Sequence, residues 1–476
     1  MLQFSTVNDL KSRKAGVAGL EIEKPFRPSR DFVISRDGVF RSRTATAYPS
    51  NQTGMSSDRW IKRTVSENQA IAERMEHLYT KLKQYPLQSF LSNIDSLSIS
   101  YRAITPTPKT NQTTTLLLLT GYNETIDKYC EFIDELMDRI PLLHVYMMDH
   151  RGQGNSGREQ MVKDNPLLAH STDWHHWNKD VEQFVSTIVQ PTTDNDNLHL
   201  FAHSMGGMIG THVAAANPNM FKTISLNAPL YKITIGSTVL ETVPILSPFA
   251  RLMVYLGYDC VNTKGGKDVY IFGSDASKVD LVNFGGMKLS HCYEREKFWH
   301  VLRVKSVTEN NGLPGVCMSP SFGWFNEVTN CYNELINVVD KITCPVIITQ
   351  AEIDCLVSNT THHQLSKKMK NAIVLNTGRG SFHEQHYGGR DDVRKMILDA
   401  VANNIQFKKV TPFIPGNPTM RSLSSPEEEV QKKDMATKKR WGQNPFIWIW
   451  MVLQWLRRRF WRCFYGSGAM TEEKRD

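Results

Sequence analysis

The sequence predicts an α/β fold organised around a mostly parallel sheet. Short apolar runs alternate along the chain with segments of helical periodicity, as in successive β-α-β units. Several runs are apolar at consecutive positions, which is typical of strands that helices cover on both faces. With 476 residues, 40% hydrophobic and 22% charged, the chain is long enough for one large globular domain with extensions or for two ordinary domains.

The elements follow in order from a basic N-terminal arm. Residues 1–57 are rich in Ser, Arg and Thr without periodicity, so we expect a flexible arm. From 59 to 83, the spacing of Ile71, Met75 and Leu78 predicts a helix. Strands are then predicted at 97–104, 114–121, 142–149, 198–204, 223–229, 345–351 and 372–378.

Two longer segments separate these strands. Residues 124–140 place apolar side chains on one helical face, which predicts an amphipathic helix. From 230 to 340 the alternation stops, and aromatic and Met residues accumulate, among them Trp324 and Phe325. This interval is either a helical insertion that packs on itself or a lid over a pocket. Its position in the chain favours the second interpretation, an inserted helical cap.

The distribution of charge and cysteine limits the function classes. Residues 1–57 contain nine basic and five acidic residues, and residues 405–476 contain fourteen and seven, so the middle of the chain is net negative. The excess of positive charge therefore lies at the two ends of the chain. We do not expect the central domain to bind nucleic acid. The first residues lack the apolar core of a signal peptide. The eight Cys show no metal-type or redox-type pairing, so free thiols in a reducing compartment are expected.

The segment LHLFAHSMGGMIG (198–210) is the strongest candidate for chemistry. Ala202-His203-Ser204-Met205-Gly206 fits the nucleophile-elbow pattern, in which a Ser lies on a sharp strand-to-helix turn between small residues. The alternative is a structural turn. A predicted strand before it and a predicted helix after it favour the elbow.

A nucleophilic Ser needs a base and an acid that orients the base. The loop after strand 345–351 supplies Asp354, with Glu352 as an alternative, and the loop after 372–378 supplies His383, with His386 as an alternative. Their order along the chain, acid and then His, is the one expected for this fold type.

The oxyanion needs two backbone N–H donors. We expect one from Met205, at the start of the helix after Ser204, and one from Tyr122, after strand 114–121. Gly121 would allow the backbone to approach closely.

Five segments in matching order carry a resemblance to a known family: MDHRGQGNSGR (148–158), FAHSMGG (201–207), LNAPLY (226–231), ITQAEIDCLVSN (348–359) and GSFHE (380–384). Together they resemble the bacterial inner-membrane lysophospholipases, in the monoacylglycerol-lipase-like, "serine aminopeptidase" branch of the α/β hydrolases. The resemblance covers roughly residues 95–407. It implies an α/β-hydrolase fold, a Ser204–Asp354–His383 triad, a helical cap and glycerolipid ester substrates. Ala202 departs from the Gly that is usual in the elbow, a departure that the lysophospholipase group shares, and Thr120-Gly121 stands where many relatives carry His-Gly.

Two other motifs have simpler interpretations. Gly152-x-Gly154 lacks the Lys and the strand-to-helix context of a phosphate loop and is expected to form a tight turn. In DWHHW (173–177), adjacent His residues on a helix cannot both face one ion, so we expect an exposed or packing segment. We therefore predict no metal and no cofactor.

The C-terminal segment 445–466 is rich in Trp and Arg. Its apolar stretch of eleven residues, 446–456, covers about half of the hydrocarbon thickness of a bilayer, which is too short to span it. Because Arg457, Arg458, Arg459 and Arg462 follow, we expect a helix that lies at the lipid–water interface. A terminal helix docked on the domain is the alternative.

The sequence therefore predicts a cytoplasmic, peripherally membrane-associated serine hydrolase that cleaves the acyl ester of single-chain glycerolipids. The rivals are a peptidase, haloperoxidase or acyltransferase on the same scaffold, and a non-catalytic membrane-attached scaffold. The predicted organisation is an arm (1–57), a core (58–229 and 341–407), a cap (230–340), a linker (408–444), an interfacial helix (445–466) and a disordered tail (467–476).

Overall fold

The computed structural model describes residues 32–34, 40–42, 60–106, 113–163, 168–192, 197–233, 243–261, 289–309, 319–378 and 380–408. They belong to two units, Met1–Met55 and Ser56–Asp476. In the first unit, β1 (Phe32–Ile34) and β2 (Phe40–Ser42) form an antiparallel pair within the predicted arm. The linker beyond residue 408, the interfacial helix and the C-terminal tail lie outside the described residues.

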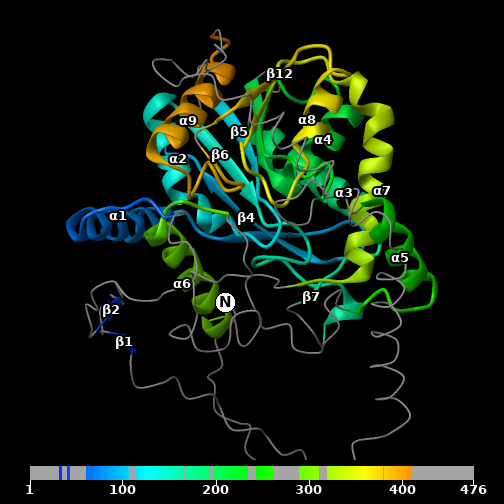
Figure 1. The fold of residues 1–476 in the computed structure, drawn as a ribbon, viewed down its shortest axis with the longest axis horizontal. Coiled ribbons are helices and arrows are strands. Elements are labelled where there is room, and N and C mark those ends of the chain that lie inside the picture. Colours follow the sequence, from blue (N-terminus) through cyan, green and yellow to red (C-terminus); the bar gives the residue numbers. More distant parts are fainter. Residues whose placement is uncertain are drawn as a thin grey trace, which may run out of the picture. The chain divides into compact units, whose positions relative to one another are not determined.

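An eight-stranded sheet forms the centre of the second unit (Figure 1). Its order is β12-β11-β9-β8-β5-β6-β4-β3. The six strands from β12 to β6 are parallel, while β4 runs antiparallel to both β6 and β3. The strands are β3 (Gln88–Leu91), β4 (Ser98–Ile104), β5 (Thr114–Leu119), β6 (Leu143–Met148), β8 (Leu198–His203), β9 (Thr223–Asn227), β11 (Val346–Gln350) and β12 (Ala372–Asn376).

The predicted α/β fold with a mostly parallel sheet is confirmed, and each of the seven predicted strands is present. The eighth strand, β3, was not predicted. Three of its four residues are exposed at the edge of the sheet, so its sequence QSFL contains no apolar run.

Helices cover both faces of the sheet, and β5 is correspondingly apolar on both of its faces. Leu116 and Leu118 join one apolar cluster and Leu117 and Leu119 the other, since successive side chains of a strand point to opposite faces. The first cluster includes side chains of α1 (Val65–Leu82), α2 (Cys130–Arg139) and α9 (Asp391–Ile405). The second includes side chains of α3 (His175–Phe184), α4 (Ser204–Ala216), α7 (Phe322–Val338) and α8 (Asn359–Ser366).

The helices described within residues 230–340 attach to the core in two places. α5 (Val243–Tyr255) packs on α7, with the Phe249 and Phe322 rings 5.6 Å apart, and α7 also packs on α4. α6 (Tyr293–Glu309) instead packs on α1, where Phe298 lies 6.0 Å from the Tyr79 ring. A short parallel pair of β7 (Leu168–Ala169) and β10 (Ser319–Pro320) joins the start of α7 to the core.

Shorter turns complete the fold. They are η2 (Ile126–Tyr129), η3 (Gln160–Val162), η5 (Gln190–Thr192) and η9 (Val339–Lys341), of 3₁₀ type, and the π-helical η4 (Val185–Val189). Within the described ranges, no helix combines the length and the apolar character needed to cross a bilayer.

Candidate active site

Ser204 lies at a sharp turn between β8 and α4, where β8 ends at His203. Its backbone φ is +49°, a left-handed conformation that costs a non-glycine residue about 1–3 kcal/mol. The turn presses against the end of β5. A Cβ at Gly206 would lie 2.4 Å from the Thr120 carbonyl oxygen and 2.6 Å from that of Leu119. The small residue in the motif is therefore required by close backbone contact, and the strained turn presents the Ser hydroxyl at the end of the sheet.

The three predicted side chains form a hydrogen-bonded row. His383 Nε2 lies 3.0 Å from Ser204 Oγ, and His383 Nδ1 lies 2.8 Å from Asp354 Oδ2. Asp354 Oδ1 in turn accepts hydrogen bonds of 2.9 Å from the N–H groups of Leu356 and Val357. Asp354 follows β11 and His383 follows β12, so all three come from the carboxyl ends of parallel strands. This is the edge at which α/β folds bind ligands.

The charges of the row favour an ionised acid beside a basic imidazole. Burial opposes ionisation of Asp354, but His383 and the two backbone N–H groups outweigh it and lower the pKa of the carboxyl. Burial likewise opposes protonation of His383, yet the Asp354 carboxylate raises the pKa of the imidazole above its ordinary value. The ring is therefore oriented by its Nδ1 partner, and its Nε2 faces the hydroxyl.

The alternative acid and base lie outside this row. Glu352 is exposed, and its Oε2 accepts the Gly380 N–H at 2.6 Å. His386 is buried with its ring 4.3 Å from that of His203 and 5.3 Å from that of Tyr129. Burial holds the pKa of His386 well below its usual range. Neither side chain therefore occupies the position of an acid or base for Ser204.

The two predicted oxyanion donors follow neighbouring strands. β5 pairs in parallel with β8, and Leu119 lies opposite Ala202, so Tyr122 and Met205 each come three residues after a paired position. Met205 is in the first turn of α4, where the helix dipole favours negative charge. The ring of Tyr122 lies 4.5 Å from that of Trp324, which belongs to α7. The loop after β5 thus lies between the nucleophile turn and a helix of the predicted cap.

A buried ion cluster beside these loops was not predicted. Lys128 is fully buried, and its Nζ lies 2.7 Å from Glu124 Oε1 and 2.8 Å from Glu384 Oε1. Glu124 Oε2 accepts the Gly121 N–H at 2.6 Å and the Tyr129 hydroxyl at 2.5 Å. Burial raises the pKa of Glu124, but Lys128 outweighs it and keeps the carboxyl ionised. In the sequence, the spacing of four residues between Glu124 and Lys128 indicates an ion pair within one helical segment. The contact with Glu384 has no such local signal, because Glu384 is distant in the sequence.

Two other motifs have structural roles. In 148–158, the Asp149 carboxylate accepts the N–H groups of Ile126 and Asn155 and closes a tight turn, which agrees with the predicted turn. Burial raises the pKa of Asp149 to about 7. In 173–177, Trp174 and Trp177 are buried in the apolar cluster, so this segment packs, as one of the two predicted alternatives required.

The parallel sheet, the strained Ser turn after β8, and the acid and His after the last two strands together define an α/β hydrolase. Residues 110–388 match the family model described as serine aminopeptidase, S33, and the chain belongs to this family.

Known proteins with lipid-related names resemble this chain. It is 25% identical over 322 residues to a probable lysophospholipase L2 of Haemophilus influenzae, which covers 67% of this chain and 91% of the relative. Lysophospholipase L2 of Escherichia coli is 24% identical, over 58% of this chain and 77% of its own length. Monoglyceride lipase of Mus musculus is 31% identical, over 41% of this chain and 61% of its own length.

Among solved structures, a soluble variant of monoglyceride lipase from Saccharomyces cerevisiae is similar, with a TM-score of 0.48 and 17% identity. The match covers 68% of this chain and 95% of that chain.

Proposed function

We propose that the protein is a serine ester hydrolase that cleaves the acyl ester of single-chain glycerolipids, either lysophospholipids or monoacylglycerols. The observation that carries the proposal is the row Ser204–His383–Asp354 at the carboxyl ends of β8, β12 and β11. The names of the relatives support the substrate class.

The reaction follows from the geometry of the row. Ser204 Oγ attacks the ester carbonyl carbon while His383 Nε2 takes the hydroxyl proton, and Asp354 stabilises the imidazolium. The N–H groups of Met205 and Tyr122 donate to the oxyanion. The proton on His383 passes to the leaving glycerol oxygen, which leaves an acyl-Ser204 ester. Water, deprotonated by His383, then attacks the acyl carbon. The bond to Ser204 Oγ breaks, His383 returns the proton to this oxygen, and the fatty acid is released.

The same proposal includes the place of action. A substrate with one acyl chain resides in or near membranes, and residues 445–466 combine Trp rings with four Arg. This segment would hold the enzyme peripherally on the cytoplasmic face of a membrane, where amphiphiles are available.

The test uses the full-length protein with a lysophospholipid, a monoacylglycerol and an aminoacyl amide as substrates. Ser204→Ala should lose labelling by a fluorophosphonate probe and reduce ester hydrolysis by about 10⁴-fold or more, because the three residues act as a unit. Ser186→Ala, at an exposed position on η4, is the matched control and should behave as the wild type. Labelling that persists in Ser204→Ala contradicts the nucleophile. Faster turnover of the amide than of either lipid contradicts the substrate class.

A further inference from the structure

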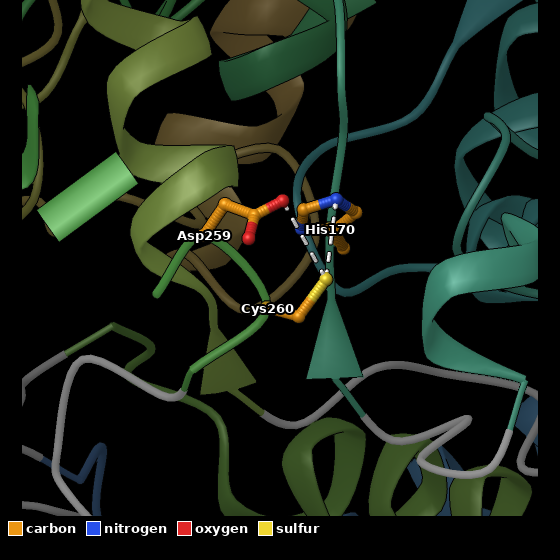
Figure 2. Close-up of side chains that lie close together, drawn as sticks. All are labelled: His170, Asp259 and Cys260. Atoms are coloured by element: carbon orange, nitrogen blue, oxygen red, sulfur yellow. Dashed lines mark hydrogen bonds between the residues drawn. The ribbon is translucent and has the colours of Figure 1, made fainter. Parts of the chain in front are cut away.

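A second cluster of reactive side chains lies where three segments meet. His170 follows β7, Asp259 and Cys260 follow α5, and Ser321 precedes α7. Figure 2 shows the His170 ring, the Asp259 carboxylate and the Cys260 sulfur turned toward one another. Their ligand atoms all lie within 4.8 Å of one another. His170 is buried, and Asp259 and Cys260 are half-buried.

The distances from the Cys260 sulfur match those between neighbouring ligands of a tetrahedral ion. Cys260 Sγ lies 3.8 Å from His170 Nε2 and 3.7 Å from Asp259 Oδ2. With Zn–S near 2.3 Å and Zn–N or Zn–O near 2.0–2.1 Å, the sulfur and a nitrogen or oxygen ligand of a tetrahedral zinc lie about 3.6 Å apart. The two distances from the sulfur therefore differ from those of a tetrahedral zinc site by only about 0.2 Å, and the His170 and Asp259 ligand atoms lie within 4.8 Å of each other. A donor set of thiolate, imidazole and carboxylate favours zinc over magnesium or calcium.

A hydrogen bond fixes the orientation of the His170 ring. Its Nδ1 lies 2.9 Å from Ser321 Oγ, which leaves Nε2 facing the sulfur. Ser321 Oγ is itself held in place, because it accepts the Trp324 N–H at the start of α7. A His ligand of a metal ion usually has such a partner on its other nitrogen. The ring also lies against Gly323, where a Cβ would be 2.6 Å from His170 Cε1.

Negative charge next to the cluster would also favour a cation. Glu159 is buried, and its Oε2 accepts the N–H of Thr172, two residues beyond His170. Among the described residues its Oε1 has no hydrogen-bond partner, and it lies 3.9 Å from the Arg151 guanidinium. A divalent ion bound by the neighbouring side chains would offset this charge together with that of Asp259.

We propose that His170, Asp259 and Cys260 bind a zinc ion that clamps the α5–α7 pair to the loop after β7, with a water molecule as the fourth ligand. Backbone hydrogen bonds already join these segments, from Ser321 N–H to Ala169 O and from Gly323 N–H to Asp259 O. The ion adds a link between side chains at the same junction. Within the first turn of α7, Trp324 contacts Tyr122, so the clamp fixes the helix that borders the loop after β5. The zinc site goes beyond the proposed ester hydrolysis and does not depend on it.

The experiment uses chelator-treated full-length protein titrated with Co²⁺, which reports thiolate ligation through a sulfur-to-cobalt charge-transfer band. Wild type should develop the band at one equivalent, and Zn²⁺ should abolish it by displacing the Co²⁺. Cys260→Ser should lack the band. Cys344→Ser is the matched control, because Cys344 is also a half-buried free thiol but belongs to no three-ligand group among the described residues. Asp259→Asn should keep the band and weaken Co²⁺ binding by at least about 10-fold.

A second readout covers the case in which a substitution disturbs folding. Zn²⁺ should raise the Tm of chelator-treated wild type and of Cys344→Ser but not of Cys260→Ser, because only the folded state holds the three ligands together. The absence of a one-equivalent cobalt–thiolate band in wild type would overturn the proposal. A band of equal intensity in Cys260→Ser would overturn it as well.

Discussion

Lys128 and Glu384 form a buried ion pair, with Nζ 2.8 Å from Oε1. Glu384 directly follows His383 in the chain. The second partner of Lys128, Glu124, accepts the N–H of Gly121, next to Tyr122. One ammonium therefore links the loop that carries His383 with the loop that carries the proposed oxyanion donor.

Removing this ammonium should be costly for stability. Lys128→Met leaves two buried carboxylates without their cation, and breaking a buried pair in this way costs about 3–5 kcal/mol in the free energy of unfolding. The matched control is Lys395→Met, which removes the Lys395–Asp399 pair on the surface of α9 and should cost less than about 1 kcal/mol. Urea denaturation measures both values. Equal stability of the two variants would show that the buried cluster contributes little.

The acid of the row can be distinguished from its neighbour in the same loop. Asp354→Asn should lower kcat by about 10⁴-fold on a soluble ester. His383 then loses the carboxylate that orients its imidazole ring and stabilises the imidazolium formed during the reaction. Glu352→Gln should leave kcat nearly unchanged, since the Glu352 side chain accepts the Gly380 N–H and does not contact His383 among the described hydrogen bonds. Circular dichroism checks that both variants are folded. The reverse order of effects would assign the acid to Glu352.

Activity should fall on the acidic side at the pKa of His383. The imidazole accepts a proton only when neutral, and Asp354 raises its pKa above 6.5. The midpoint of the acid limb of kcat/KM should therefore lie above pH 6.5. In Asp354→Asn, the residual activity should show this limb shifted to lower pH, since the raising charge is gone. A limb that stays at the same pH in the variant would mean that another group titrates.

Two neighbouring residues of α7 should affect catalysis differently. Trp324 contacts Tyr122, so Trp324→Ala should lower kcat for a short soluble ester and for a long-chain lysolipid alike. Phe325 packs with Phe249 and Phe322 of the α5–α7 pair, and Phe325→Ala should mainly raise KM for the long-chain lipid. Asn333→Ala, at an exposed position on the same helix, is the control. If Phe325→Ala affects both substrates equally, the α5–α7 pair supports the fold but does not select the substrate.

Residues 445–466 should determine membrane binding. Truncation after Asn444 should move the protein from vesicles into the supernatant while hydrolysis of a soluble ester stays nearly unchanged, because no residue of the row lies beyond His383. Replacing Arg457, Arg458, Arg459 and Arg462 by Gln should weaken binding to anionic vesicles by about 1 kcal/mol per residue and reduce its salt dependence. Interfacial binding is contradicted if the full-length protein does not bind anionic vesicles. It is also contradicted if alkaline carbonate does not extract the protein from membranes.

Local patterns in the sequence predicted the fold and the row of the candidate site. Strands such as β5 and β8 are buried at nearly every position, so they stand out as apolar runs. Ser204 lies within a short motif, and the loops after β11 and β12 contain few acids and His residues to choose from. The parallel sheet then brings these loops to one edge, whatever the details of packing.

Contacts between distant segments could not be predicted in this way. Glu384 is far from Lys128 along the chain, and nothing in the residues around either one indicates the other. His170 likewise meets Asp259 and Cys260 only because β7 pairs with β10 next to the end of α5. The packing of α6 on α1 depends on the same kind of information, since an apolar helix face does not specify its partner.

The pairing of β5 with β8 sets the distance between two loops of the candidate site. Because Leu119 lies opposite Ala202, backbone hydrogen bonds between the strands set how far Tyr122 extends relative to Ser204. Inserting or deleting one residue within β5 would move Tyr122 by about 3.3 Å and would also turn every following side chain to the other face. Substitutions within Thr114–Leu119 leave that spacing intact. For this strand, length is therefore under tighter geometric control than composition.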